Sequence, residues 1–404
     1  MNKQIPTSLA SLAGALRSGA LPLDRFIDLL EARFAEREAE VLAFVPEAGR
    51  FARLRREAEA LLTRYADRAQ RPPLFGVPVG VKDIFQVTGF VTRAGSSLPD
   101  GLLQGPEGPA VTALREAGAL ILGKSVTTEF AYFAPGPTRN PHAPGHTPGG
   151  SSSGSAAAVG AGLCHLALGT QTIGSVNRPA AFCGVAGYKP SYNRIDKRGV
   201  IPVSDAADHV GIFTPRVTDL ALAAKILCRE WQAPATERRP VLGIPLGPYL
   251  ERASSEGRDH FEMTCQRLAD AGFTVRKIAA MPDFADIYER HNLLVAAEAA
   301  AVHAAWYGEY GERYHEKTAA LIERGQGVAP EELQAARQGQ LQLRQELTQL
   351  MDENDIDLWV SPAAVGAAPP GLESTGDPVM NLPWTHAGLP TVSIPAGTNQ
   401  AGLP

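Results

Sequence analysis

Apolar residues recur at helical spacing over the first 70 positions. The runs DRFIDLLEARFA and GRFARLRREAEALLTRYA place Leu and Phe three or four positions apart among charged residues, which predicts amphipathic helices. The segment Ser8–Leu16 is short and apolar and follows Lys3, as in a signal peptide, but the helical spacing continues beyond it. Pro72 and Pro73 end this region, so we expect an N-terminal helical arm over residues 8–70.

Short apolar segments alternate with glycine- and proline-rich turns over residues 72–230. GALILG, CHLALGT and HVGIF are typical of strands, whereas the alanine-rich run after Ser155 and the segment TDLALAAKILC are typical of helices. This alternation predicts an α/β fold whose chemistry lies on loops at the strand ends.

The remaining chain has a larger helical share. VLGIPL and FTVRKI predict strands on either side of a helix, and a mostly helical stretch follows over roughly 284–353. DIDLWVSP and PTVSIPAG predict late strands. Because only glycine and proline turns separate these parts, we expect a single domain. It would hold a catalytic core over 72–230, a mostly helical variable region over 240–355 and a C-terminal part of the sheet over 356–404.

Composition narrows the class of protein. With 404 residues, 44% of them hydrophobic and 20% charged, the chain can bury a sizeable core. The net charge of −5, without a basic block, argues against a nucleic-acid or membrane-surface partner. No apolar run approaches the roughly 18 residues of a membrane-spanning helix. Four widely spaced cysteines are typical of reduced thiols in the cytoplasm.

Three local patterns resemble functional motifs but lack the context that those motifs need. Gly118–Ser125 has the spacing of a phosphate-binding loop, yet Ala-Leu-Ile-Leu between its glycines is typical of a strand. Gly150–Gly154 has the spacing of a nucleophile elbow, but the preceding prolines exclude an incoming strand, and His386 is its candidate base only by default. His142 and His146 lie in a proline-glycine loop, so we expect no metal site.

A serine site with a lysine base remains. Lys82 ends the apolar segment Val77–Val81, and burial there would lower its pKa and make the amine a proton acceptor. A surface lysine paired with Asp83 is the alternative. In TQTIGSVNRP a strand runs into a tight Gly174–Ser175 turn, whose backbone N–H groups could stabilise an oxyanion. An ordinary glycine-serine turn is the alternative there.

Five segments together resemble the amidase signature family, which are serine hydrolases of amide bonds. The segments are GVPVGVKDIF, GALILGKSVTTEFA, RNPHAPGHTPGGSSSGSAAAVGAG, LALGTQTIGSVNRPAAFCGVAGYKPS and STGDPVMNLPWTHAGLPTVSIPAG. They follow the family's order and spacing. The resemblance implies the amidase signature fold, a single domain with a mixed, twisted central sheet covered by helices on both faces. The family usually continues with further strands and a terminal helix, so we expect either a truncated chain or a short member, with the C-terminal part of the sheet cut short.

The resemblance also implies a Ser–Ser–Lys triad. Lys82 would be the base, Ser151 the bridging serine after a cis peptide bond, and Ser175 the nucleophile. The oxyanion would be stabilised by the N–H groups of Thr172, Ile173, Gly174 and Ser175. Ser152, by a hydrogen bond to Lys82, and Gln171 would be supporting residues. The run GGSSSGSAAAVGAG would then be a rigid loop that enters a helix rather than a flexible linker.

The chain departs from the usual family pattern around the nucleophile. Many members have Asp-x-Gly-Gly-Ser there, with an arginine two positions after the serine. This chain has Gln171, Ile173 and Asn177, and its arginine is Arg178. Gln171 can hydrogen-bond but brings no charge. Ile173 can supply its N–H provided that its φ is negative, because β-branched residues resist positive φ.

Together these features predict an amidase that hydrolyses a small or medium acyl amide through a seryl acyl-enzyme. The candidate pocket residues are Phe85, Tyr132, Phe133 and Arg194. A carbamate (urethane) or urea-type hydrolase is one alternative. The glutamine-hydrolysing subunit of a tRNA-dependent amidotransferase is another, against which Asn177 and the chain length argue. We expect no cofactor, and a monomer or homodimer whose partner is a small-molecule amide or carbamate, without nucleic acid or membrane.

Overall fold

A six-stranded mixed sheet forms the centre of the molecule. The computed structural model describes residues 5–232 and 238–404, and its central strands have the order β2-β1-β3-β5-β4-β9. Strand β1 pairs in parallel with β2 and β3, and the other neighbours are antiparallel. The strands are β1 (Pro78–Lys82), β2 (Leu120–Ser125), β3 (Leu166–Gln171), β4 (Ala186–Lys189), β5 (His209–Thr214) and β9 (Thr391–Ser393). The prediction of a mixed central sheet is confirmed.

The N-terminal arm is helical, as predicted. It consists of α1 (Leu9–Ser18), α2 (Leu23–Val41), α3 (Arg50–Arg64) and a short 3-10 helix (Arg68–Gln70). Ser8 caps α1 by accepting from the Ser11 N–H, and Gly19 ends it in the left-handed region at φ 72°. Leu9, Leu12 and Leu16 are buried, so the Ser8–Leu16 segment is part of the folded core.

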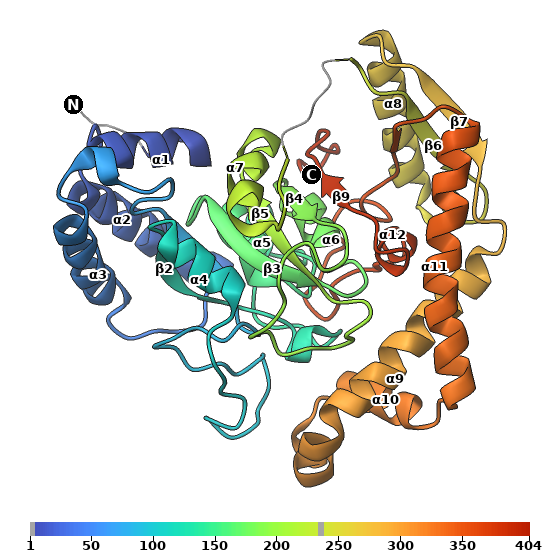
Figure 1. Ribbon diagram of the computed structural model, residues 1–404, viewed down its shortest axis with the longest axis horizontal. Coiled ribbons are helices and arrows are strands. Elements are labelled where there is room, and N and C mark those ends of the chain that lie inside the picture. Colours follow the sequence, from blue (N-terminus) through green and yellow to red (C-terminus); the bar gives the residue numbers. More distant parts are fainter. Residues whose placement is uncertain (1–4, 233–237) are drawn as a thin grey trace.

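Helices pack around the central sheet (Figure 1). They are α4 (Pro109–Glu116), a 3-10 helix (Glu129–Ala131), α5 (Ser153–Gly160), α6 (Asn177–Phe182) and α7 (Val217–Leu227). Helix α5 packs against β1, β2, β3 and β5. Its small residues permit this close approach, since a Cβ on Gly154 would lie 2.1 Å from the Ala43 carbonyl oxygen. The glycine-serine run is therefore a packed helix and not a linker.

The C-terminal half adds long helices and a second sheet. The elements are β6 (Leu242–Leu246), a 3-10 helix (Leu250–Arg252), α8 (Ser255–Asp270), β7 (Val275–Ala279), α9 (Phe284–Tyr310), a 3-10 helix (Gly311–Arg313), α10 (Glu316–Gln326), α11 (Pro330–Glu353), β8 (Leu358–Trp359) and α12 (Leu382–His386). Strands β7, β6 and β8 form this parallel sheet. The predicted strand in DIDLWVSP thus pairs with β6 and not with the central sheet, which only β9 joins from this region.

Two hydrophobic cores meet at helix α9. Val295 and Ala299 belong to the large core under the central sheet, whereas Phe284 and Ile287 belong to a second core with Ile173 and Trp384. Helix α9 therefore ties the C-terminal half to the loop after β3.

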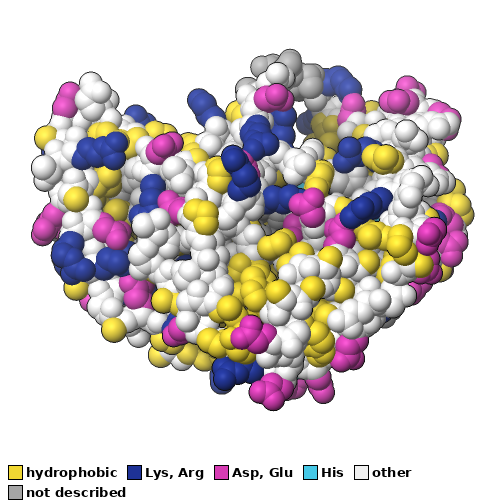
Figure 2. Space-filling view, turned by 60° about the horizontal axis from the view of Figure 1, so that its bottom comes forward, with side chains coloured by type: hydrophobic (Ala, Val, Ile, Leu, Met, Phe, Trp, Pro, Cys, Tyr) yellow, Lys and Arg dark blue, Asp and Glu magenta, His cyan; other side chains and the backbone are white. Residues whose placement is uncertain are grey.

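On the face shown in Figure 2, basic and acidic side chains are interspersed. Among the described residues, no helix is both long and apolar enough to cross a membrane.

Candidate active site

Parallel pairing of β1 and β3 brings distant residues to one edge of the sheet. Val81 is in register with Leu168, so the carboxyl ends of the two strands lie together. Lys82 is the last residue of β1, and Thr170 and Gln171 end β3. Helix α5, which follows Ser151 and Ser152, packs against both strands. This topology explains why residues about 70 to 90 positions apart form one site.

Lys82 is completely buried and contacts two hydroxyl groups. Its Nζ lies 2.8 Å from Ser151 Oγ and 2.8 Å from Thr170 Oγ1. Burial holds the pKa of Lys82 well below its ordinary value of 10.5, against a smaller attraction from Asp208. Asp83 instead pairs with Lys124 at 2.8 Å, so the alternative of a surface Lys82–Asp83 pair is wrong. A neutral amine next to Ser151 can accept a proton.

The loop before α5 holds Ser151 in place. The Gly150–Ser151 peptide bond is cis, as the family resemblance implies. Ser152 Oγ donates to the Thr170 carbonyl at 3.1 Å and accepts from the Thr170 N–H at 3.2 Å. Ser152 therefore fixes the backbone of Thr170, and the hydrogen bond that we expected between Ser152 and Lys82 is not formed. Ser152 thus acts on Lys82 indirectly, by holding Thr170, whose hydroxyl bonds Lys82. The sequence did not predict this contact between Thr170 and Lys82.

Ser175 lies in the loop between β3 and α6, beside a small pocket. The N–H groups of Thr172, Ile173, Gly174 and Ser175 make no hydrogen bond with any described residue. Ile173 is not among the described residues with positive φ. This β-branched residue can therefore supply its N–H without backbone strain, as its expected role requires. Unpaired N–H groups next to a serine hydroxyl can receive the negative charge of a tetrahedral intermediate.

Gln171 organises this loop. Its Oε1 accepts from the N–H groups of Val176 and Asn177 at 2.8 and 2.9 Å, and its Nε2 donates to Thr385 Oγ1 at 2.9 Å. Asn177 is turned toward β9, where its side chain bonds Thr391 and Ser393. The uncharged Gln171 therefore stabilises the turn before α6 by hydrogen bonds, without the negative charge that an aspartate would bring.

Arg178, and not residue 177, faces the site. Its guanidinium donates to the Gly150 carbonyl at 2.6 Å, to the Gly376 carbonyl and to Thr375 Oγ1. It is fully buried, has no salt bridge with a described residue, and its Nε is unpaired. Burial lowers the pKa of Arg178 to about 9. Arg178 therefore supports the peptide next to Ser151 and places a cation at the pocket wall.

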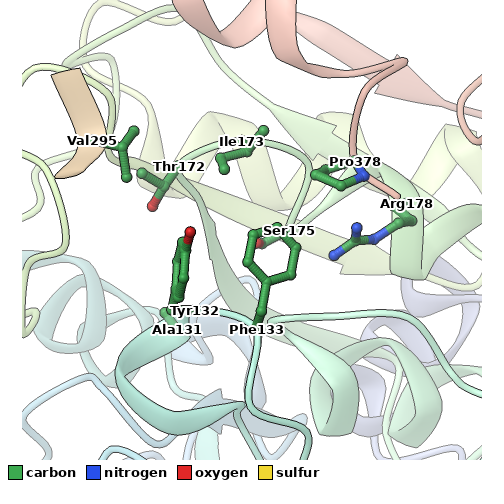
Figure 3. A pocket seen from close by; sticks show the side chains of 9 residues that line it. All are labelled: Ala131, Tyr132, Phe133, Thr172, Ile173, Ser175, Arg178, Val295 and Pro378. Atoms are coloured by element: carbon green, nitrogen blue, oxygen red, sulfur yellow. The ribbon is translucent and has the colours of Figure 1, made fainter. Parts of the chain in front are cut away.

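The pocket at Ser175 has a free volume of about 10 Å³. Figure 3 shows the ring of Phe133 next to Ser175, with Tyr132 on one side of it and the guanidinium of Arg178 on the other. Its lining residues are Ala131, Tyr132, Phe133, Thr172, Ile173, Ser175, Arg178, Val295 and Pro378. Tyr132 and Phe133 thus lie where we expected them.

Two other candidates for the pocket lie elsewhere. Arg194 pairs with Glu230 at 3.2 Å in a partly exposed position, and Phe85 is buried in the main core. Neither residue lines the pocket at Ser175, so this part of the expectation is wrong.

The local motif matches take other roles. Leu120–Ser125 is strand β2, and not a phosphate-binding loop. His386 is buried and contacts His291, so it is not a base for a nucleophile elbow. Among the described residues, no cluster of three or more His, Cys, Asp or Glu side chains is placed to hold a metal.

Comparisons with known proteins agree with this geometry. A family model described as Amidase matches residues 32–404. A glutamyl-tRNA(Gln) amidotransferase subunit from Synechococcus sp. (strain RCC307) is 29% identical, over 98% of this chain and 92% of that protein. The subunit of the same name from Geobacter sp. (strain M21) is 31% identical, over 82% and 79%. A crystal structure of an amidase has a TM-score of 0.87 and 32% identity, over 98% and 93%.

These relatives correct the expectation about partners. Their names describe one subunit of an enzyme that acts on glutamyl-tRNA(Gln). The exclusion of nucleic acid, and the expectation of a monomer or homodimer, are therefore wrong. Net charge averages over a whole surface, so it cannot exclude a local nucleic-acid contact or one made through another subunit.

The family match spans most of the chain, and the amidase crystal structure shares its fold over nearly all of it. The chain therefore belongs to the amidase family and is an amide hydrolase.

Proposed function

We propose that this enzyme hydrolyses the amide bond of a small or medium acyl compound through Ser175, Ser151 and Lys82. The observation that carries the proposal is the buried amine of Lys82, 2.8 Å from Ser151 Oγ, in a site where Ser175 borders a pocket. A buried lysine with a lowered pKa is a base, and its amine is within hydrogen-bond reach of Ser151 Oγ.

The reaction begins with two proton transfers. Lys82 accepts the Ser151 proton while Ser151 accepts the Ser175 proton, and Ser175 Oγ attacks the carbonyl carbon of the amide. The carbonyl π electrons move to its oxygen, and the N–H groups of residues 172–175 stabilise the resulting oxyanion. When the intermediate collapses, the C–N bond breaks and the amine leaves with a proton returned through Ser151.

An acyl-enzyme on Ser175 remains. Water attacks its ester carbon and gives its proton to the Ser151–Lys82 pair, and the C–O bond to Ser175 breaks as that proton returns to Ser175 Oγ. The free acid leaves. One proton leaves with the amine and water replaces it, so the three side chains end in their starting protonation states and no cofactor is required.

The pocket supports a compact acyl group. Its free volume of about 10 Å³ is about what one water molecule needs, and the aromatic rings of Tyr132 and Phe133 form part of its wall. A carbamate or urea-type substrate presents the same carbonyl to Ser175 and remains the alternative within this mechanism. The four buried, free cysteines support a reducing, cytoplasmic location.

A second candidate is the glutamine-hydrolysing subunit of a tRNA-dependent amidotransferase. The names of the curated relatives favour it. In that case the same site would release ammonia from glutamine, and the enzyme would work with other subunits and a tRNA.

The test is turnover of a panel of anilides, primary amides, carbamates, ureas and glutamine, with Ser175→Ala and Lys82→Ala alongside the unchanged chain. We expect both variants to fold and to lose hydrolysis, and a fluorophosphonate to label Ser175. Full activity in either variant, or labelling at Ser152, would refute the mechanism. Turnover of glutamine alone would favour the transferase subunit.

A further inference from the structure

The carbonyl groups of the loop after β3 are bonded from the C-terminal half of the chain. The Thr172 carbonyl oxygen lies 3.1 Å from His291 Nε2, and the Ile173 carbonyl oxygen lies 2.7 Å from Thr385 Oγ1. His291 is on α9 and Thr385 is on α12. Neither residue lines the pocket, and the amidase mechanism proposed above does not use them.

These bonds decide where the next N–H groups point. The C=O and N–H of a trans peptide are planar and antiparallel, and among the described residues only the Gly150–Ser151 bond is cis. With the Thr172 carbonyl directed to α9, the Ile173 N–H must point away from α9. With the Ile173 carbonyl directed to α12, the Gly174 N–H must point away from α12. Both N–H groups are unpaired within the described residues.

A second histidine fixes the ring of His291. A carbonyl only accepts, so His291 Nε2 carries the proton that it donates to Thr172, and its Nδ1 is an acceptor. His386 Nδ1, 3.2 Å away, must then be the donor to His291 Nδ1. Both rings are buried, and burial lowers the pKa of His291 to about 4 and of His386 to about 2. The neutral rings that this donor pattern needs are therefore the forms present near neutral pH.

Thr385 is oriented in the same manner. Its hydroxyl accepts from Gln171 Nε2 and has one proton to give, and its shortest acceptor is the Ile173 carbonyl. The carbonyl groups of Thr172 and Ile173 are thus bonded by two buried side chains. Each of these side chains is oriented by a hydrogen bond of its own.

We propose that His291, oriented by His386, and Thr385 are positioning residues that aim the Ile173 and Gly174 N–H groups at the oxyanion. This inference rests on the proposed function. Loss of one oxyanion donor costs about a hundredfold to a thousandfold in rate. Since loss of the His291 bond loosens a donor without removing it, His291→Leu is expected to lower kcat about tenfold to a hundredfold. KM should change little, because the donors act mainly in the transition state.

The experiment compares His291→Leu with His291→Gln. The amide nitrogen of glutamine can replace Nε2 as the donor to Thr172, so His291→Gln should recover much of the lost kcat and of the rate at which a fluorophosphonate labels Ser175. His165→Leu is the matched control: it removes a buried Nε2 bond to the Pro6 carbonyl next to the opposite end of β3, and should leave kcat unchanged.

His386 provides a second, independent comparison. Asparagine can replace the Nδ1 donor, so His386→Asn should retain more kcat than His386→Leu, and this pair decides the question if His291→Leu does not fold. An unchanged kcat in folded His291→Leu, or His291→Gln as slow as His291→Leu, would overturn the inference. Ser175→Ala, measured in parallel, separates the two proposals: if it stays active the proposed function fails, whereas if it is inactive and His291→Leu is not, only the positioning role fails.

Discussion

Replacement of Thr170 by valine tests how Lys82 is oriented. Thr170 is buried, and its hydroxyl lies 2.8 Å from Lys82 Nζ. Valine has nearly the same shape, so Thr170→Val removes this hydrogen bond and leaves the packing intact. In the proposed mechanism a neutral Lys82 donates to Thr170 and accepts from Ser151, and it becomes an ammonium in the transition state.

The expected magnitude follows from that change of charge. A hydrogen bond from a neutral group is worth about 0.5–1.5 kcal/mol, and one from a charged group about 1.5–3 kcal/mol. The difference, about 1–1.5 kcal/mol, is stabilisation that Thr170 supplies only once Lys82 is protonated. We therefore expect kcat/KM of Thr170→Val to fall about tenfold, because about 1.36 kcal/mol corresponds to a factor of about ten in rate.

The assay is the pH profile of kcat/KM for the best substrate of the panel. Loss of the Thr170 acceptor destabilises the ammonium more than the amine, so the pKa of Lys82 falls further and the acid limb moves to lower pH. Thr170→Ser keeps the hydroxyl and should stay close to the unchanged enzyme. An unaltered kcat/KM, or an acid limb that moves to higher pH, would refute the reasoning. A loss greater than about a thousandfold would show that Thr170 does more than orient Lys82.

Two further predictions concern stability. Gly154→Ala places a Cβ 2.1 Å from the Ala43 carbonyl oxygen and 2.4 Å from Val126 N, and should lower the free energy of unfolding in urea by about 1–3 kcal/mol. Gly145→Ala, with nothing within 4 Å, is the control, and equal stability of the two variants would contradict the packing argument. Burial lowers the pKa values of His291, His303 and His386 to about 4, 4 and 2. Below pH 6.5, the ordinary pKa of a histidine, the unfolded chain therefore binds protons at these rings that the folded chain does not bind. The free energy of unfolding should therefore be highest above about pH 6.5 and should fall as the pH drops from about 6.5 toward about 4. The fall is up to about 1.4 kcal/mol per pH unit for each ring. Urea unfolding at about pH 7 and about pH 5 checks this, and greater stability at the lower pH would contradict it.

Much of the site could be read from local sequence because its parts are strand ends and tight turns. The run VPVGVK predicts a buried strand that ends in a lysine, and that lysine is buried with a lowered pKa. The turn at Gly174–Ser175 likewise marks, from its own residues, where the chain leaves β3 with N–H groups outside the strand ladder, although the direction of those groups is set from α9 and α12. The small residues after Ser152 predict a helix that can lie close to the sheet, as α5 does.

Other features depend on contacts between segments far apart in the chain. Thr170 reaches Lys82 because β1 and β3 are parallel neighbours, whereas Arg194 pairs with Glu230 and does not line the pocket. Sequence alone could not pair His291 with the Thr172 carbonyl, 119 positions away, or Thr385 with the Ile173 carbonyl, 212 positions away. The sequence by itself therefore determined which residues could carry the chemistry, since periodicity and turn preferences are local. Only the tertiary structure decided how those residues are aimed, because hydrogen bonds across the fold set the direction of a side chain or a peptide group.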